Sequence, residues 1–167
     1  MSIMVFPILL LLASVGFGQE LDEHLHVLRP FTEMTWVGHY VESSDSGLVH
    51  VVRWEPILNG SVIRSTKEVT ALSFRMETLY FWDWEKETIA FLQLTNRGTF
   101  SRGTAELVEN RVTLFGRGIQ PNSVSEFKQT FEIQPDGTLH DHFYRREDGE
   151  WVQGHKIVYT GEKGIAK

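Results

Sequence analysis

Residues 125–160 read SEFKQTFEIQPDGTLHDHFYRREDGEWVQGHKIVYT, which is three alternating segments separated by two compact turns. The Pro-Asp-Gly turn at 135–137 combines a proline that presets φ with a glycine that tolerates positive φ. The Glu-Asp-Gly turn at 147–149 again ends on glycine. Large side chains recur at every second position between these turns, which is the period of a β-strand. The stretch predicts three antiparallel strands joined by hairpins.

The same pattern extends from residue 36 towards the C-terminus, with turn residues between the segments. Before it, the spacing of Leu21, Leu25 and Leu28 predicts one short helix over residues 20–32, ended by Pro30. The expected strands cover residues 36–41, 48–55, 61–69, 76–85, 88–95, 99–108, 111–116, 125–133, 138–145 and 150–160.

Short connections between these segments exclude parallel pairing, which needs long crossovers. Ten antiparallel strands in an open sheet would leave exposed edges, and closure removes them. The sequence therefore predicts an all-β fold, an antiparallel up-and-down β-barrel of about ten strands with a short N-terminal helix. A β-sandwich is the alternative. We expect one domain over residues 19–167, because no linker or repeat interrupts it.

Residues 1–18 differ from the rest of the chain and carry no charged side chain. Their apolar core is shorter than the ~20 residues that a membrane-spanning helix needs. Gly16 and Gly18 match the small residues that precede a signal-peptidase cut, here before Gln19. We expect a cleaved signal peptide and a secreted or periplasmic protein. A buried N-terminal strand and an uncleaved anchor are the alternatives.

Composition excludes several classes of function. The net charge of −6, from 16 basic and 22 acidic residues, argues against a nucleic-acid partner. The chain has no cysteine, so disulfides, thiolate metal ligands and thiol nucleophiles are absent. No Gly-x-Ser-x-Gly motif or phosphate-binding loop occurs. No pattern in the sequence predicts an oligomeric state.

Several strand faces mix aromatic side chains with histidine and hydroxyl groups, where a packed core would favour Leu, Ile and Val. One such face of the last strand would carry Trp151, Gln153, His155, Ile157 and Tyr159. We interpret these faces as the wall of a cavity for a small hydrophobic ligand, with a packed aromatic core as the alternative. The residues expected to contact the ligand are Trp54, Tyr80, Trp82, His142, Trp151 and His155.

The helix-then-strand opening over residues 28–40 resembles lipocalin-like proteins of the calycin group. Its Thr35-Trp36-x-Gly38 is similar to the motif that opens the first strand in nitrobindin-like barrels, although Met34 stands where a classical lipocalin has glycine. The segment 53–60 (RWEPILNG) resembles the second strand and turn of the same barrels. The resemblance implies structural roles for Trp36 and Gly38.

Nitrobindin-like barrels hold haem through a histidine near the C-terminus, for which His140, His142 and His155 are the candidates here. None matches a motif, so no cofactor is expected. His140 and His142 share a strand face and could bind a divalent metal only with a third ligand from another strand. A further alternative is an isomerase, cyclase or hydrolase that uses a His/carboxylate pair inside the barrel.

Overall fold

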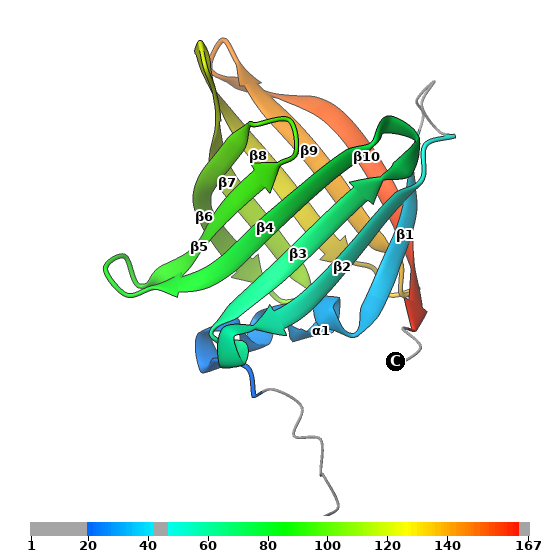
Figure 1. The fold of residues 1–167 in the computed structure, drawn as a ribbon, viewed down its shortest axis with the longest axis vertical. Helices are drawn as coiled ribbons and strands as arrows, with labels where there is room; N and C mark the ends of the chain where they lie inside the picture. Colours follow the sequence, from blue (N-terminus) through cyan, green and yellow to red (C-terminus); the bar gives the residue numbers. More distant parts are fainter. Residues whose placement is uncertain (1–19, 42–46, 164–167) are drawn as a thin grey trace, which may run out of the picture.

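Ten antiparallel strands close into one barrel in the computed structural model, which describes residues 20–41 and 47–163 (Figure 1). This confirms the predicted fold class and excludes the sandwich. The expected leader, residues 1–18, lies outside the described residues. The strands are β1 (Met34–Tyr40), β2 (His50–Ile57), β3 (Val62–Val69), β4 (Phe74–Asp83), β5 (Thr88–Thr95), β6 (Phe100–Val108), β7 (Arg111–Gln120), β8 (Ser123–Ile133), β9 (Leu139–Glu147) and β10 (Glu150–Lys163).

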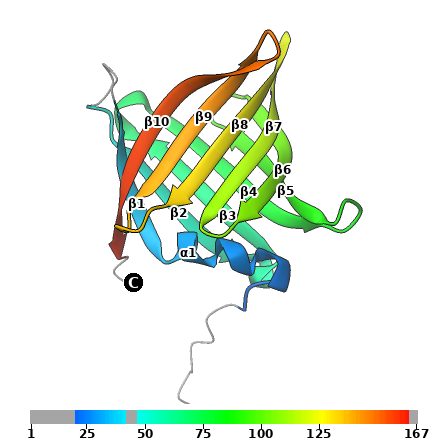
Figure 2. The same ribbon diagram turned by 180° about the vertical axis from the view of Figure 1, so that it is seen from behind.

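Each strand pairs with its neighbours in the chain, and β1 closes the barrel by pairing with β10. In that seam Trp36 lies opposite Gly161 and Gly38 lies opposite Tyr159. Figure 2 shows β7 to β10 side by side on the near wall, which lies at the back in Figure 1. Closure pairs each strand on both sides for at least part of its length, which removes a free sheet edge.

Several strands continue past the ends that the sequence pattern predicted, and β2 and β7 show why. The prediction that the second strand ends at residue 55, before Pro56, is wrong, because β2 continues to Ile57. β2 pairs with β1 only from His50 to Arg53, so Pro56 lies where that side of β2 is an edge, and proline is tolerated there. β7 continues past its predicted end at residue 116 to Gln120, so that only a two-residue turn separates it from β8.

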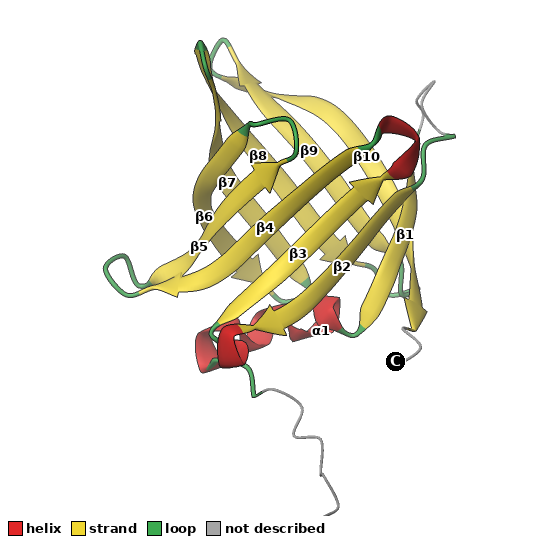
Figure 3. Ribbon diagram, in the orientation of Figure 1, coloured by secondary structure: helices red, strands yellow, loops and turns green. Residues whose placement is uncertain are grey.

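Short helices cover the lower end of the barrel (Figure 3). A 3-10 helix, η1 (Glu23–Leu28), is followed directly by α1 (Arg29–Thr32). The side chain of Asp22 caps η1 by accepting a 3.0 Å hydrogen bond from the backbone N–H of His24. Pro30 does not end the helical region as expected. It lies in the first turn of α1, where its missing N–H is not needed.

Trp36 joins this helical cap to the barrel wall. Its indole Nε1 donates a 3.0 Å hydrogen bond to the carbonyl of Phe31, and the side chain is fully buried. Gly38, two residues along β1, lies directly under the ring of Tyr159, and a Cβ at this position would overlap the ring. Both contacts agree with the structural roles expected for Trp36 and Gly38.

The interior next to the cap is solidly packed. Trp54 of β2 stacks on Tyr80 of β4 with 4.8 Å between ring centroids, and Phe31 and Phe131 pack against Trp54. Leu25 and Leu28 of η1 and Phe31 of α1 enter this end of the barrel and are almost completely buried. The half of the barrel near the cap is therefore a packed aromatic core. Any open space must lie towards the other end.

None of the helices among the described residues combines the length and the apolar character needed to cross a bilayer.

Candidate functional site

A cavity of about 260 Å³ occupies the barrel end opposite the helical cap. Its rim is mostly apolar, with Val69, Leu72 and Phe74 at the connection between β3 and β4, and it also carries Arg97, which lies over the Phe74 ring. Its deeper wall is polar. The side chains that line it are Tyr40, His50, Lys67, Val69, Leu72, Phe74, Met76, Gln93, Arg97, Gln129, Phe143 and His155.

We call the buried polar groups at the floor of this cavity the interior polar cluster: His50, Lys67, Gln129, Asp141 and His155. Asp141 is completely buried, and its Oδ1 accepts a 2.8 Å hydrogen bond from Nε2 of Gln129. Its Oδ2 lies 3.6 Å from Nζ of Lys67, and the Lys67 residue is only 9% exposed. The carboxylate therefore lies behind two side chains that face the cavity, and it balances the charge of the lysine.

Two histidines complete the cluster. Both ring nitrogens of His50 and Nε2 of His155 are buried without a hydrogen-bond partner among residues 20–41 and 47–163. Tyr40 lies between the rings, with centroids 4.5 Å from His50 and 5.4 Å from His155. Buried polar atoms normally have partners, since leaving one unpaired costs roughly 1–3 kcal/mol. These nitrogens are therefore available to a ligand in the cavity.

Electrostatics keep the floor of the cavity close to neutral. Burial, together with the charge of Lys67, lowers the pKa of His50 to about 4. Burial also lowers the pKa of His155, against the opposing effect of Asp141. Burial lowers the pKa of Lys67, and the nearby Asp141 carboxylate partly offsets this. Near neutral pH both imidazoles are thus uncharged, and each can donate and accept one hydrogen bond.

The structure brings only His155 of the six predicted ligand contacts to the cavity wall. Trp54 and Tyr80 face inwards as expected but belong to the packed half near the cap. Trp82 packs against the same core, and its ring stacks on His24 of η1 at 4.1 Å. These three side chains therefore belong to a packed aromatic core, which was the alternative to a ligand-binding wall.

His142 and Trp151 lie outside the barrel. Along β9 the buried Leu139 and Asp141 alternate with His140 and His142, which places the two histidines on the outer face. The prediction that Trp151 shares a face with His155 is wrong, because a β-bulge between Gln153 and His155 shifts the register of β10. An extra residue reverses the alternation, so Trp151 and His155 point to opposite sides.

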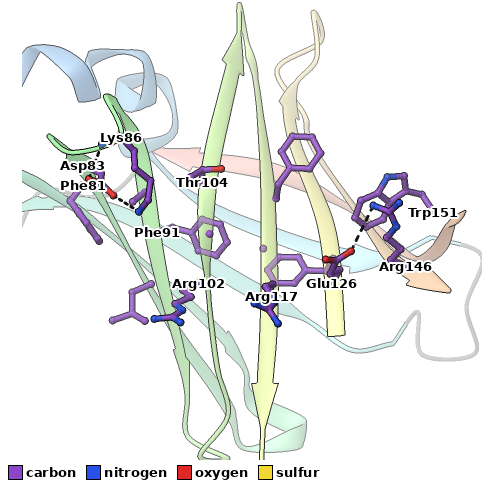
Figure 4. A pocket seen from close by; sticks show the side chains of 16 residues that line it. Phe81, Asp83, Lys86, Phe91, Arg102, Thr104, Arg117, Glu126, Arg146 and Trp151 are labelled. Carbon is purple, nitrogen blue, oxygen red and sulfur yellow. Dashed lines mark hydrogen bonds and ion pairs between the residues drawn. The ribbon is translucent and has the colours of Figure 1, made fainter. Parts of the chain in front are cut away.

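Trp151 instead borders a groove of about 820 Å³ on the outer surface of β4 to β10 (Figure 4). Lys86 and Asp83 lie at one end of the groove, with 2.8 Å between Nζ and Oδ2. At the other end Arg146 is 3.7 Å from Glu126 and 5.4 Å from the Trp151 ring. Most of the charged groups in this groove are paired with each other.

The histidine sets proposed for metal or haem do not come together. His140 and His142 are outside, with ring centroids 6.2 Å apart, whereas His155 is inside. Within the described parts of the chain, no three His, Asp or Glu side chains are placed to hold a metal ion. Of the three histidines considered for haem, only His155 lies on the wall of the interior cavity, whose volume is about 260 Å³.

Sequence reasoning missed Lys67 and Gln129 of the interior polar cluster. It considered Asp141 only as one of several carboxylates that could act as acid or base if buried, and His50 only as a possible third metal ligand. A signal was present, because Lys67 alternates with Ile63 and Val69 on one face of β3. A lysine on an otherwise inward-facing side indicates a buried charge that needs a partner. Its partner Asp141 comes from β9, on the opposite wall, and no local pattern connects the two.

A closed, ten-stranded, antiparallel up-and-down barrel with a short helical cap is consistent with the calycin or lipocalin-like class. No known family matches the sequence, and no curated protein is similar enough to count as a relative.

Proposed function

We propose that this protein binds a small amphipathic molecule in the barrel cavity, with the polar end of the ligand on the interior polar cluster and its apolar end at the rim. The observation that carries this proposal concerns both ring nitrogens of His50 and Nε2 of His155, which are buried beside an open cavity and have no hydrogen-bond partner among the described residues. A ligand hydroxyl or carbonyl would satisfy them. Val69, Phe74 and Met76 would then cover an apolar body.

The size and charge of the cavity narrow the ligand class. Its volume of about 260 Å³ lies below the roughly 300–1,000 Å³ typical of small-molecule sites, so we propose a compact ligand. Lys67 is paired with Asp141 and both histidines are neutral near pH 7, so the floor carries no net charge. The charged side chain that lines the cavity beyond this floor is Arg97, whose guanidinium lies over the Phe74 ring. An uncharged alcohol, aldehyde or ketone on an aromatic or short aliphatic body fits these conditions.

The test uses cinnamyl alcohol as the probe and isothermal titration calorimetry as the measurement. We expect one-to-one binding to the native chain. Met76→Trp places an indole in the cavity and should weaken binding roughly ten-fold or more, a loss of about 1.4 kcal/mol. Leu94→Trp, a matched change on the exposed face of β5, should leave the affinity unchanged.

Two results would contradict the proposal. One is the absence of heat from cinnamyl alcohol up to its solubility limit. The other is equal affinity in the native chain and the Met76→Trp variant, since binding would then occur away from the cavity.

A second candidate function is acid–base catalysis in the same cavity, because buried histidines and a buried carboxylate lie next to open space. Binding and catalysis differ in what happens to the bound molecule. Mass spectrometry of a carbonyl compound recovered after long incubation would show it unchanged for a binding protein. An isomerised or hydrated product that is lost in Asp141→Asn would favour the enzyme.

We also propose that the protein is exported, on the basis of the uncharged apolar segment and the small residues at Gly16 and Gly18. N-terminal sequencing of protein made with its natural start should then begin at Gln19.

A further inference from the structure

Lys67 differs from the other lysines in the described part of the chain because it is the one buried lysine, and it faces a cavity. The other described lysines are exposed or partly exposed: Lys86, Lys128, Lys156 and Lys163. Lys67 is on the inward face of β3 and next to the apolar rim formed by Val69 and Phe74. A compact carbonyl compound in the cavity would meet a primary amine at the polar end of the site.

We propose that Lys67 captures small apolar aldehydes in the cavity as a reversible imine. This inference rests on the proposed function, because the aldehyde must occupy the same cavity before it reacts. It goes further by assigning a covalent step to one residue and by selecting aldehydes among the uncharged ligands.

The reaction needs no partner beyond the aldehyde and the side chains already present. The amine nitrogen of Lys67 adds to the carbonyl carbon, so that a C–N bond forms while the C=O π bond breaks and its oxygen takes a proton. The carbinolamine then loses water, which breaks the C–O bond and forms C=N. One aldehyde and one amine are consumed, one imine and one water are produced, and nothing is oxidised or reduced.

The neighbours of Lys67 suit each stage of this sequence. A neutral imidazole can take the proton that the nitrogen loses on addition and return it to the departing hydroxyl, and His50 and His155 both line the cavity as free bases. Asp141, at 3.6 Å from Nζ, would pair with the protonated imine as it now pairs with the ammonium. The pair would therefore stay neutral before and after capture.

Burial also favours the reactive form of the lysine. It lowers the pKa of Lys67, which raises the fraction of unprotonated amine near neutral pH relative to an exposed lysine. The apolar body of a captured aldehyde would fill the mouth of the cavity beside Val69 and Phe74, and this would keep water from the imine and slow its hydrolysis.

The experiment compares cinnamaldehyde with cinnamyl alcohol, which has the same carbon skeleton but cannot form an imine. The full chain is incubated with cinnamaldehyde and cyanoborohydride, which reduces an imine to a stable amine, and is then analysed by intact mass and peptide mapping. We expect one adduct, located on Lys67. Lys67→Arg keeps the positive charge beside Asp141 and should lose the adduct, whereas the surface change Lys128→Arg should retain it.

Binding of cinnamyl alcohol, measured in parallel on all three proteins, separates the possible failures. If the alcohol binds but no adduct forms, or if adducts spread over the surface lysines and persist in Lys67→Arg, the imine is overturned and the proposed function stands. If the alcohol does not bind, both proposals are overturned. Should Lys67→Arg fail to fold, the double variant Lys67→Met with Asp141→Asn removes the amine without leaving a buried charge.

Discussion

Lys67 of β3 and Asp141 of β9 meet across the barrel interior, with 3.6 Å between Nζ and Oδ2, and both side chains are buried. They come from strands that are not neighbours in the sheet, so this ion pair connects opposite walls. A buried pair of this kind is sensitive to the loss of either partner, because the other charge is then uncompensated in a medium of low polarity.

Removal of one partner should destabilise the protein more than removal of both. We expect Lys67→Met and Asp141→Asn each to lower the free energy of unfolding by about 3–5 kcal/mol. The double variant should lose clearly less than the sum of the two, because it leaves no unpaired charge. Urea denaturation of the four proteins provides the measurement. Additive losses would show that the two charges do not interact.

The hydrogen bond from Trp36 to the carbonyl of Phe31 should couple the helical cap to β1. Trp36→Phe removes the donor and leaves a buried carbonyl unpaired, so we expect a loss of about 1–3 kcal/mol in unfolding free energy. Hydrogen exchange should accelerate first in η1 and α1. Trp151→Phe is the matched control, because Trp151 lies on the outer surface of the barrel, where it borders the groove, and should tolerate the change. Unchanged exchange in the cap would contradict the coupling.

Gly38 is required by the Tyr159 ring above it. Gly38→Ala adds a methyl group where the ring already lies, and we expect a cost of about 1–3 kcal/mol in thermal or urea unfolding. Gly47→Ala serves as the control, since nothing lies within 4 Å of the added carbon. If both variants are equally stable, the close approach of β1 and β10 does not depend on this glycine.

Acid should destabilise the barrel partly through His50. Its pKa is about 4 in the folded protein against 6.5 for an ordinary histidine, so between these values the unfolded chain binds a proton that the folded chain does not. Stability therefore falls as the pH drops through this window, by up to about 3 kcal/mol from this residue. The charges of Lys67 and His155 also contribute to the lowered pKa of His50.

Unfolding free energies of the native chain and of His50→Asn, measured from pH 7 to pH 4, check this prediction. The variant should show a shallower decline, with a residual slope from His155, whose pKa is also lowered. His140→Gln on the outer face of β9 should follow the native curve. A native curve that is flat over this range would show that His50 is not buried in its neutral form.

The fold could be predicted from the sequence because the features that define it, alternation and turn residues, are local. Alternation and turn residues define each hairpin, as in the Pro-Asp-Gly turn before β9, and ten strands joined by nine consecutive hairpin connections leave barrel closure as the way to remove the edges. The errors in the strands arose where local signals depend on pairing. Pro56 remains in β2 because β1 has stopped pairing there, and Trp151 faces outwards because β10 contains a bulge.

Much less of the candidate site could be predicted from the sequence. The sequence by itself determined a cysteine-free, ten-stranded antiparallel barrel with a helical cap, since period, turns and composition act over a few residues at a time. Only the tertiary structure decided which aromatics fill the barrel and where the cavity remains. It also brought Lys67 to Asp141, and within the part of the chain that the structure describes it left both ring nitrogens of His50 and Nε2 of His155 without hydrogen-bond partners beside open space. The physical reason is closure, because strands far apart in the chain face each other only once the barrel is complete.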